Sequence, residues 1–219
     1  MRGITTIIFD LDGLMVDSEP SYRTAAYHAI LEQGFILTDE LCDRVTGVPH
    51  LACEQIMQQE FGSGFSIEKY RKAWVPIWYR LIESSGMRLK PGLIELLEWA
   101  GGKKLKYAVA TSSNYDDALF SLKSAGIDGR ITTIISGDRI KNGKPAPDIF
   151  LAAATATGTP PAECLVLEDS NAGVEAAHRA GMRVIMVPDL VAASAQSQRL
   201  ACMVVPTLHD ALKQIRTAA

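Results

Sequence analysis

The sequence has no long apolar run and no excess of positive charge. No apolar stretch approaches the roughly 20 residues that a membrane-spanning helix needs. The first residues also lack the basic flank and long apolar segment of a secretion signal. The formal net charge is −3, which argues against a basic surface that binds nucleic acid. We therefore expect a cytoplasmic protein that binds neither a membrane nor nucleic acid.

Residues that typically bind zinc or form disulfides are few. The four cysteines are widely scattered, without the close paired spacing of a zinc or redox motif, so reduced thiols are expected. The four histidines are dispersed as well, and we expect His178 and His209 to be surface or packing residues. No feature of the sequence indicates an obligate protein partner.

Short apolar runs alternate with helical patterns through most of the 219 residues, which is typical of a doubly wound parallel sheet. The expected strands lie at about 5–10, 106–111, 132–136, 164–168, 183–187 and 202–205. The expected helices lie between them at 91–100, 116–126, 146–158 and 171–181. The predicted fold class is therefore α/β with a Rossmann-like core.

Residues 17–88 interrupt this alternation. They contain only helical periodicities, such as IEKYRKAWVPIWYRLIES, and no strand-like run of any length. We interpret them as an inserted all-helical cap domain, with residues 1–16 and 89–219 forming the catalytic core domain. Acidic residues outnumber basic ones in this block, which argues against a polyanionic partner.

Two aspartates follow the first predicted strand in the stretch IIFDLDG. Side chains two residues apart on an extended segment point to the same side, so Asp10 and Asp12 should converge. Carboxylates that close need a shared proton or a cation between them. A polar turn is the alternative, but the carboxyl edge of a parallel sheet is where ligands bind.

The second predicted core strand ends in hydroxyl residues. Thr111 is the last residue of that strand, and Ser112 and Ser113 follow it. Hydroxyls and unpaired amides at a helix N-terminus can bind an anion. Thr111 is the stronger candidate, whereas we expect Ser113 and Asn114 to cap the next helix.

A lysine follows the third predicted strand, between a glycine and a proline. The proline restricts the backbone of Lys144 to extended geometry and so fixes where its ammonium points. Such a cation could neutralise nearby carboxylates and a phosphate. Lys141 has no such constraint.

A second carboxylate pair, Glu168 and Asp169, ends the fourth predicted strand. Neighbouring strand residues face opposite ways, so both reach one site only if the turn beyond the strand brings them in. With Asp10 and Asp12 they would form a cluster of hard oxygen ligands suited to Mg²⁺.

Four segments in this order resemble the motifs of the haloacid dehalogenase superfamily: DLDGLMVDSEP, ATSSN, KNGKPAPDIF and VLEDSNAGVEAAHRAGM. The resemblance spans nearly the whole chain and indicates the branch with a helical cap after the first motif. Within that branch the sequence is similar to the β-phosphoglucomutase-like sugar phosphatases, which include pseudouridine 5′-phosphatase.

The resemblance implies a role for each carboxylate. Asp10 matches the nucleophile that becomes an aspartyl phosphate, and Asp12 matches the general acid/base. Mg²⁺ would be bound by Asp10, the Asp12 backbone carbonyl and Asp169, with Glu168 acting directly or through water.

The resemblance also implies which groups bind the substrate. Thr111, the Ser112 amide and Lys144 match the groups that hold the transferring phosphoryl oxygens. β-Phosphoglucomutase itself has a His twelve residues after its nucleophile, whereas this chain has Tyr22 at that position. Where the cap of that mutase has an Arg, this chain has His50. We take Tyr22 and His50 as substrate-binding candidates, although cap residues such as these could equally serve packing.

The sequence therefore predicts a Mg²⁺-dependent phosphomonoesterase that acts on a small phosphorylated metabolite, a sugar phosphate or a nucleoside monophosphate. A sugar phosphomutase of the same fold is one alternative. A catalytically silent binding or regulatory module is another, and it is disfavoured because Asp10, Asp12 and Lys144 are all present. The sequence does not identify the individual substrate.

Overall fold

The computed structural model describes residues 3–46 and 50–217 of the chain. The chain divides into two compact units. The core unit comprises Met1–Asp17 and Arg88–Ala219, and the helical unit comprises Ser18–Met87.

The core unit is built on a six-stranded sheet in the order β3-β2-β1-β4-β5-β6, in which every pair of neighbours is parallel. The strands are β1 (Thr6–Phe9), β2 (Lys106–Thr111), β3 (Ile134–Ser136), β4 (Cys164–Glu168), β5 (Arg183–Met186) and β6 (Met203–Val204). All residues of β1 and β4 are buried, as expected of central strands that are covered on both faces. The predicted parallel α/β fold is confirmed.

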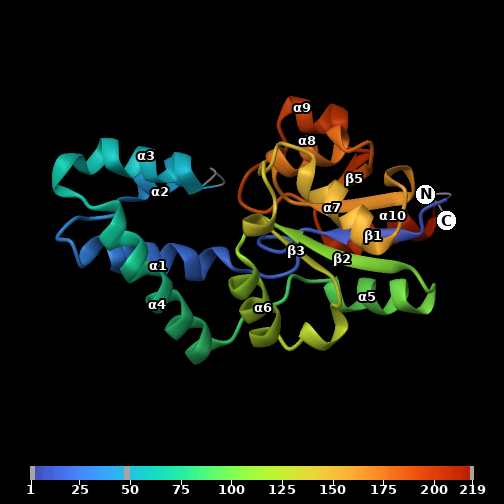
Figure 1. The fold of residues 1–219 in the computed structure, drawn as a ribbon, viewed down its shortest axis with the longest axis horizontal. Coiled ribbons are helices and arrows are strands. Elements are labelled where there is room, and N and C mark those ends of the chain that lie inside the picture. Colours follow the sequence, from blue (N-terminus) through green and yellow to red (C-terminus); the bar gives the residue numbers. More distant parts are fainter. Residues whose placement is uncertain (1–2, 47–49, 218–219) are drawn as a thin grey trace. The chain divides into compact units, whose positions relative to one another are not determined.

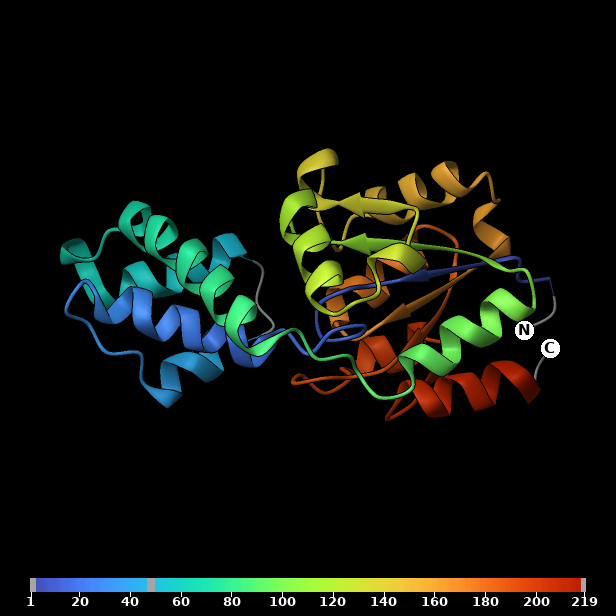
Figure 2. The same cartoon turned by 90° about the horizontal axis from the view of Figure 1, so that it is seen from below.

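Helices cover both faces of this sheet (Figure 1 and Figure 2). One face carries α5 (Leu93–Gly102), α6 (Tyr115–Ser124) and α10 (Leu208–Thr217), and the other carries α7 (Asp148–Thr157), α8 (Asn171–Arg179) and α9 (Ala195–Leu200). On the second face Ile8 and Val166 of the sheet pack against Phe150 of α7 and Val174 of α8. Short 3₁₀ turns complete the connections at η2 (Asp128–Arg130), η3 (Gly137–Arg139) and η4 (Pro161–Glu163).

The strand order reverses between β1 and β4. The chain runs from β1 outward through β2 to β3 and then returns to β4 on the other side of β1. Phe9 of β1 pairs in register with Leu167 of β4, so Asp10 and Glu168 follow at neighbouring strand ends. Ligands bind at such a reversal point in open α/β sheets, because the connections there diverge to opposite faces.

The helical unit contains α1 (Glu19–Leu31), α2 (Asp39–Val45), α3 (His50–Phe61), the 3₁₀ turn η1 (Gly62–Gly64) and α4 (Ile67–Ser85). Helices α1 and α4 pack along each other and bury Ala25, Ala29 and Trp78. The Ser66 hydroxyl accepts a hydrogen bond from the Lys69 amide and caps α4, a contact worth about 1 kcal/mol. Within the described residues, no helix is both long and apolar enough to span a membrane.

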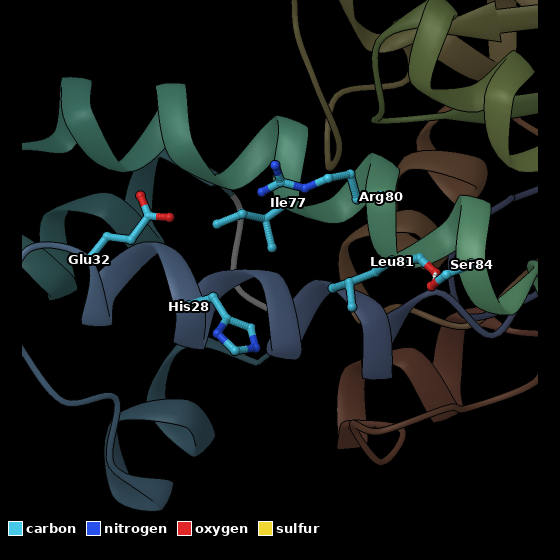
Figure 3. Close-up of a pocket in the computed structure, with 6 residues that line it drawn as sticks. All are labelled: His28, Glu32, Ile77, Arg80, Leu81 and Ser84. Atoms are coloured by element: carbon cyan, nitrogen blue, oxygen red, sulfur yellow. Dashed lines mark hydrogen bonds between the residues drawn. The ribbon is translucent and has the colours of Figure 1, made fainter.

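A shallow pocket of about 380 Å³ lies between α1 and α4 of this unit (Figure 3). It is lined by His28, Glu32, Ile77, Arg80, Leu81 and Ser84. Because a carboxylate lines it together with Arg80, the pocket lacks the concentrated positive charge that would favour a phosphate.

The chain leaves and re-enters the core unit through two paired segments. Val16 forms an antiparallel bridge with Leu89. Next to it the Asp17 amide donates a hydrogen bond to the Arg88 carbonyl over 2.9 Å. The two ends of the inserted sequence are therefore joined by backbone hydrogen bonds.

Two helices of the core unit were not predicted. The short helix α9 has six residues, so its apolar periodicity is too brief to stand out. Helix α10 buries Leu208, Ala211, Leu212 and Ile215, and that spacing is a helical signal present in the sequence. Helix α10 could therefore have been predicted from the sequence, whereas α9 could not.

Candidate active site

The first predicted carboxylate lies at the end of β1. The Asp10 amide donates to the Leu167 carbonyl of β4 over 3.0 Å, which extends the sheet by one step. The chain then turns sharply at Gly13, whose φ of +85° lies in the left-handed region that favours glycine. Asp10 is 5% exposed, so the turn leaves its carboxylate largely removed from water.

Lys144 is the cation of this site. Its ammonium donates to Asp10 Oδ1 over 2.5 Å and to Glu168 Oε1 over 2.6 Å. The three side chains are 6%, 8% and 0% exposed, so the contact is a buried bridge between two strand ends. Lys141 is exposed. The structure thus brings Lys144, and not Lys141, to the carboxylates.

Asp169 joins the same group from the turn after β4. Asp10, Glu168 and Asp169 each offer a carboxylate oxygen, and these oxygens lie within 4.8 Å of one another. The turn therefore brings in both members of the Glu168–Asp169 pair. Three carboxylates around one ammonium leave an excess of negative charge, which protons or a cation must compensate.

The pKa values of the group follow from burial and from Lys144. Burial raises the pKa of Asp10 to about 8, although Lys144 opposes the shift. Burial, with the neighbouring Glu168 and Asp10, raises the pKa of Asp169 to about 10. Burial also disfavours the ionised form of Glu168, but Lys144 and the hydrogen bonds from Ser170 and Asp169 together hold the pKa of Glu168 below its ordinary value. Burial alone would lower the pKa of Lys144, but Asp10 and Glu168 raise it.

The oxygen ligands of this group suit a hard divalent cation. All three are carboxylates, and no histidine or cysteine belongs to the group, which favours Mg²⁺ or a similar ion over zinc. The acidic group predicted from the sequence is therefore present as a candidate metal centre. The Asp12 carboxylate, which the prediction included with it, lies outside this group of three.

Asp12 is held by hydroxyl groups from the end of β2. The Ser113 hydroxyl donates to Asp12 Oδ2 over 2.7 Å, and the Thr111 hydroxyl lies 3.3 Å from the same oxygen. The Ser113 amide in turn donates to Thr111 Oγ1 over 3.0 Å. Thr111 is 1% exposed and Asp12 is half-buried, so these bonds orient the Asp12 carboxylate within the site.

Ser113 is a residue whose position the sequence interpretation missed. It was expected to cap the next helix, but the N-cap position of α6 is Asn114. The Ser113 side chain points instead to Asp12. The signal available in the sequence was the run of three hydroxyl residues at a strand end, which does not specify which of them turns inward.

The remaining predicted site residues are Ser112, Tyr22 and His50. Ser112 is exposed, and its carbonyl oxygen is so close to Gly137 that a Cβ there would lie 2.2 Å from it. Tyr22 lies in α1 of the helical unit, where its ring packs 5.3 Å from that of Trp74 and 5.4 Å from that of Trp78. His50 begins α3, but its side chain lies outside the described part of the structure.

The tryptophans of the helical unit pack against each other. The rings of Trp74 and Trp78 are stacked, with centroids 5.8 Å apart and an angle of 8° between their planes. Trp78 is fully buried, and its indole N–H donates to the Ser21 hydroxyl over 3.0 Å. Trp74 therefore packs against Tyr22 and Trp78 within the helical unit.

The sequence matches one protein family over most of its length. Residues 7–187 match the family model of the haloacid dehalogenase-like hydrolases. The chain belongs to this family. The match covers the strand that precedes Asp10, the helical unit, Lys144 and the Glu168–Asp169 pair, so it includes every part of the candidate site.

Individual members of the haloacid dehalogenase-like family give further detail. The chain is 34% identical over 179 residues to the phosphorylated carbohydrates phosphatase of Thermotoga maritima, which covers 82% of each chain. It is 35% identical over 200 residues to a Drosophila melanogaster protein named "Probable pseudouridine-5'-phosphatase", which covers 86% of this chain and 84% of that one. The crystal structure of a hydrolase from Pseudomonas syringae, 29% identical, gives a TM-score of 0.80 and covers 98% of this chain and 99% of that one.

These relatives bear on the predicted activity. The predictions of a haloacid dehalogenase-like hydrolase and of a phosphatase are confirmed. The names of the relatives state a class of reaction, whereas the chemical steps and the metal depend on the residues of the site itself.

Proposed function

We propose that this protein hydrolyses the phosphate ester of a small sugar phosphate or nucleoside monophosphate, in a reaction that requires Mg²⁺ and passes through an aspartyl phosphate. The observation that supports this most strongly is the buried ammonium of Lys144 between Asp10 and Glu168, at the point where the strand order reverses. The activities for which the Thermotoga and Drosophila relatives are named support the substrate class.

In the proposed reaction an Asp10 oxygen attacks phosphorus and the ester oxygen departs. Asp12 gives that oxygen a proton, and it later takes a proton from the water that attacks the aspartyl phosphate. The hydroxyls of Ser113 and Thr111 hold the Asp12 carboxylate in one orientation, which positions the proton. Splitting one displacement into two easier ones is the advantage of the covalent intermediate.

Lys144 has two tasks in this proposal. Its ammonium keeps the Asp10 carboxylate oriented, and it offers positive charge to the oxygens of the transferring phosphoryl group. Thr111 and the Ser112 amide would bind those oxygens from the end of β2. Electrostatic stabilisation of this kind is the main contribution that a protein makes to phosphoryl transfer.

Asp10, Glu168 and Asp169 would hold Mg²⁺, with the Asp12 backbone carbonyl as a further ligand. When bound, the cation would offset the repulsion between the carboxylates and an approaching phosphate. The carboxylate oxygens of these three residues, which lie within 4.8 Å of one another, are consistent with this ligand set.

The helical unit would be the cap of this enzyme. We propose that it selects the part of the substrate beyond the phosphate, with Tyr22 and His50 as candidate contacts. Because Tyr22 packs on Trp74 and Trp78, its ring would offer a rigid surface rather than a mobile one.

The test is a phosphate-release screen of the purified protein over many phosphorylated metabolites, with Mg²⁺ present. Asp10→Asn is the matched control, because the amide keeps the shape of the side chain but cannot attack phosphorus. We expect release from a few sugar phosphates or nucleoside monophosphates and none above background in the variant. Release by Asp10→Asn at the wild-type rate would refute the mechanism, and a complete lack of release by the wild type would favour the silent module.

A further inference from the structure

Asp189 lies beyond the four motifs, on the segment that follows β5. The Val187 amide donates to the Glu168 carbonyl over 2.7 Å, so this segment runs beside the end of β4. Asp189 Oδ1 accepts a hydrogen bond from the Lys90 ammonium over 2.6 Å, and that ammonium lies 3.8 Å from Asp17 Oδ1. One oxygen of Asp189 is therefore firmly held.

The other oxygen of Asp189 is buried and has no hydrogen-bond partner among the described residues. Leaving a buried polar group unsatisfied costs about 1–3 kcal/mol, and more for a charged group. Such an atom in a native structure calls for a partner beyond those that the described residues provide.

The position of this oxygen indicates what that partner is. A Cβ built on Gly13 would lie 3.2 Å from Asp189 Oδ2 and 2.5 Å from Asp169 Oδ2. Both carboxylate oxygens thus lie within 3.2 Å of one point beside Gly13, which stands three residues after Asp10 in the chain. Asp189 Oδ2 is directed to the neighbourhood of the candidate metal ligands.

We propose that Asp189 is a positioning residue of the metal centre. Its Oδ2 accepts a hydrogen bond from a water molecule bound to the cation, while Lys90 anchors its Oδ1. Magnesium keeps several of its waters when a protein binds it, so acceptors beyond the direct ligands are needed to orient them. This inference rests on the proposed Mg²⁺ site and adds to it a residue outside the family motifs.

A purely mechanical role is the competing explanation. In that case the Lys90–Asp189 pair would only fasten the segment that leads from the helical unit to the sheet, and metal affinity would not depend on Asp189. Two variants separate the explanations. In Asp189→Asn the amide oxygen can still accept from Lys90, but the amide nitrogen places a donor where Oδ2 is an acceptor. Lys90→Met removes the fastening and keeps the Asp189 acceptor.

The experiment measures Mg²⁺ binding to the metal-free full chain by titration calorimetry, without substrate, together with the thermal midpoint in the absence of metal. Glu95→Gln is the control, since Glu95 is also an ion-paired carboxylate, bound to His209 on the outside of the core unit. We expect Asp189→Asn to weaken Mg²⁺ binding about 10- to 100-fold. Lys90→Met should weaken it less, and Glu95→Gln should leave it unchanged.

The outcomes distinguish this inference from the proposed function. Wild-type protein that binds Mg²⁺ and an Asp189→Asn variant that binds it equally well would overturn the role of Asp189 alone. A greater loss of affinity in Lys90→Met than in Asp189→Asn would also overturn it, in favour of the mechanical role. Failure of the wild type to bind Mg²⁺ would refute the metal site itself and this inference with it.

Discussion

Gly173 lies in the first turn of α8, and one added methyl group at this position should strongly destabilise the fold. A Cβ there would lie 1.6 Å from Oε1, 2.0 Å from Cδ and 2.5 Å from Cγ of Glu168. Non-bonded atoms cannot approach this closely, so Gly173→Ala forces the Glu168 side chain to move away from α8. Because the backbone of Gly173 is helical, alanine brings no strain of its own and adds up to about 1 kcal/mol of helix propensity.

The magnitude follows from what Glu168 holds. Its carboxylate is fully buried, accepts from Lys144 over 2.6 Å and accepts from the Ser170 amide over 2.8 Å. Breaking a buried ion pair costs about 3–5 kcal/mol. After the gain in helix propensity, we expect Gly173→Ala to lower the free energy of unfolding by about 2–4 kcal/mol. Phosphate release should fall as well, since Lys144 loses one of its two anchors.

The assay is thermal and urea unfolding followed by circular dichroism, with phosphate release measured on the same samples. Gly101→Ala in α5 is the matched control, because a Cβ there meets no atom within 4 Å. It should be neutral or slightly stabilising. In a Glu168→Ala background the clash is absent, so Gly173→Ala should cost little there. An unchanged cost in that background, or wild-type stability of the single variant, would refute the reasoning.

Other predictions concern the cation, the metal and the reaction. Lys144→Met should reduce phosphate release at least about 100-fold, because the phosphoryl oxygens lose a buried positive charge; release within a few-fold of wild type would contradict this. Since the pKa values of Asp10 and Asp169 are raised, Mg²⁺ must displace their protons, and its affinity by calorimetry should increase between about pH 6 and 9; a constant affinity would exclude this linkage. Chelator should abolish activity and Mg²⁺ should restore it, with Ca²⁺ a poor substitute because it prefers a larger, looser oxygen shell; full activity in chelator would assign the carboxylates another purpose. With β-glucose 1-phosphate and a trace of glucose 1,6-bisphosphate we expect free phosphate, because Tyr22 and His50 replace the His and Arg of the mutase; rapid formation of glucose 6-phosphate would favour the mutase.

The parallel sheet and the convergence of its strand ends could be predicted because both follow from local pattern. The run IIF that ends β1 is apolar, and a parallel sheet places the residues after each such run at one edge. Asp10, Lys144 and Glu168 were therefore assigned to one site, and Lys144 lies within hydrogen-bond distance of both carboxylates.

The remaining features depend on side-chain directions that periodicity does not specify. Beyond the end of β2 the alternation of strand residues stops, so the sequence does not tell which hydroxyl turns toward Asp12, and Ser113 was missed. Asp189 lies outside the four quoted motifs, and its contact with Lys90, 99 residues away in the sequence, forms only in the folded chain. The packing of Tyr22 on two tryptophans of α4 likewise depends on how two helices meet.

The paired segments at Val16 and Leu89 have a consequence for how the parallel sheet forms. The Asp17 amide donates a hydrogen bond to the Arg88 carbonyl, so the segment between them is closed at its base in the way that a hairpin loop is. Once this junction has formed, the effective chain connection between β1 and β2 is short, although the paired residues Thr6 and Lys106 are far apart in sequence. The entropy of closing a loop grows only slowly with its length, so an insertion at this point adds little to the cost of forming the sheet. The helical segment is therefore accommodated at this junction without interrupting the register of β1 with β2 or β4.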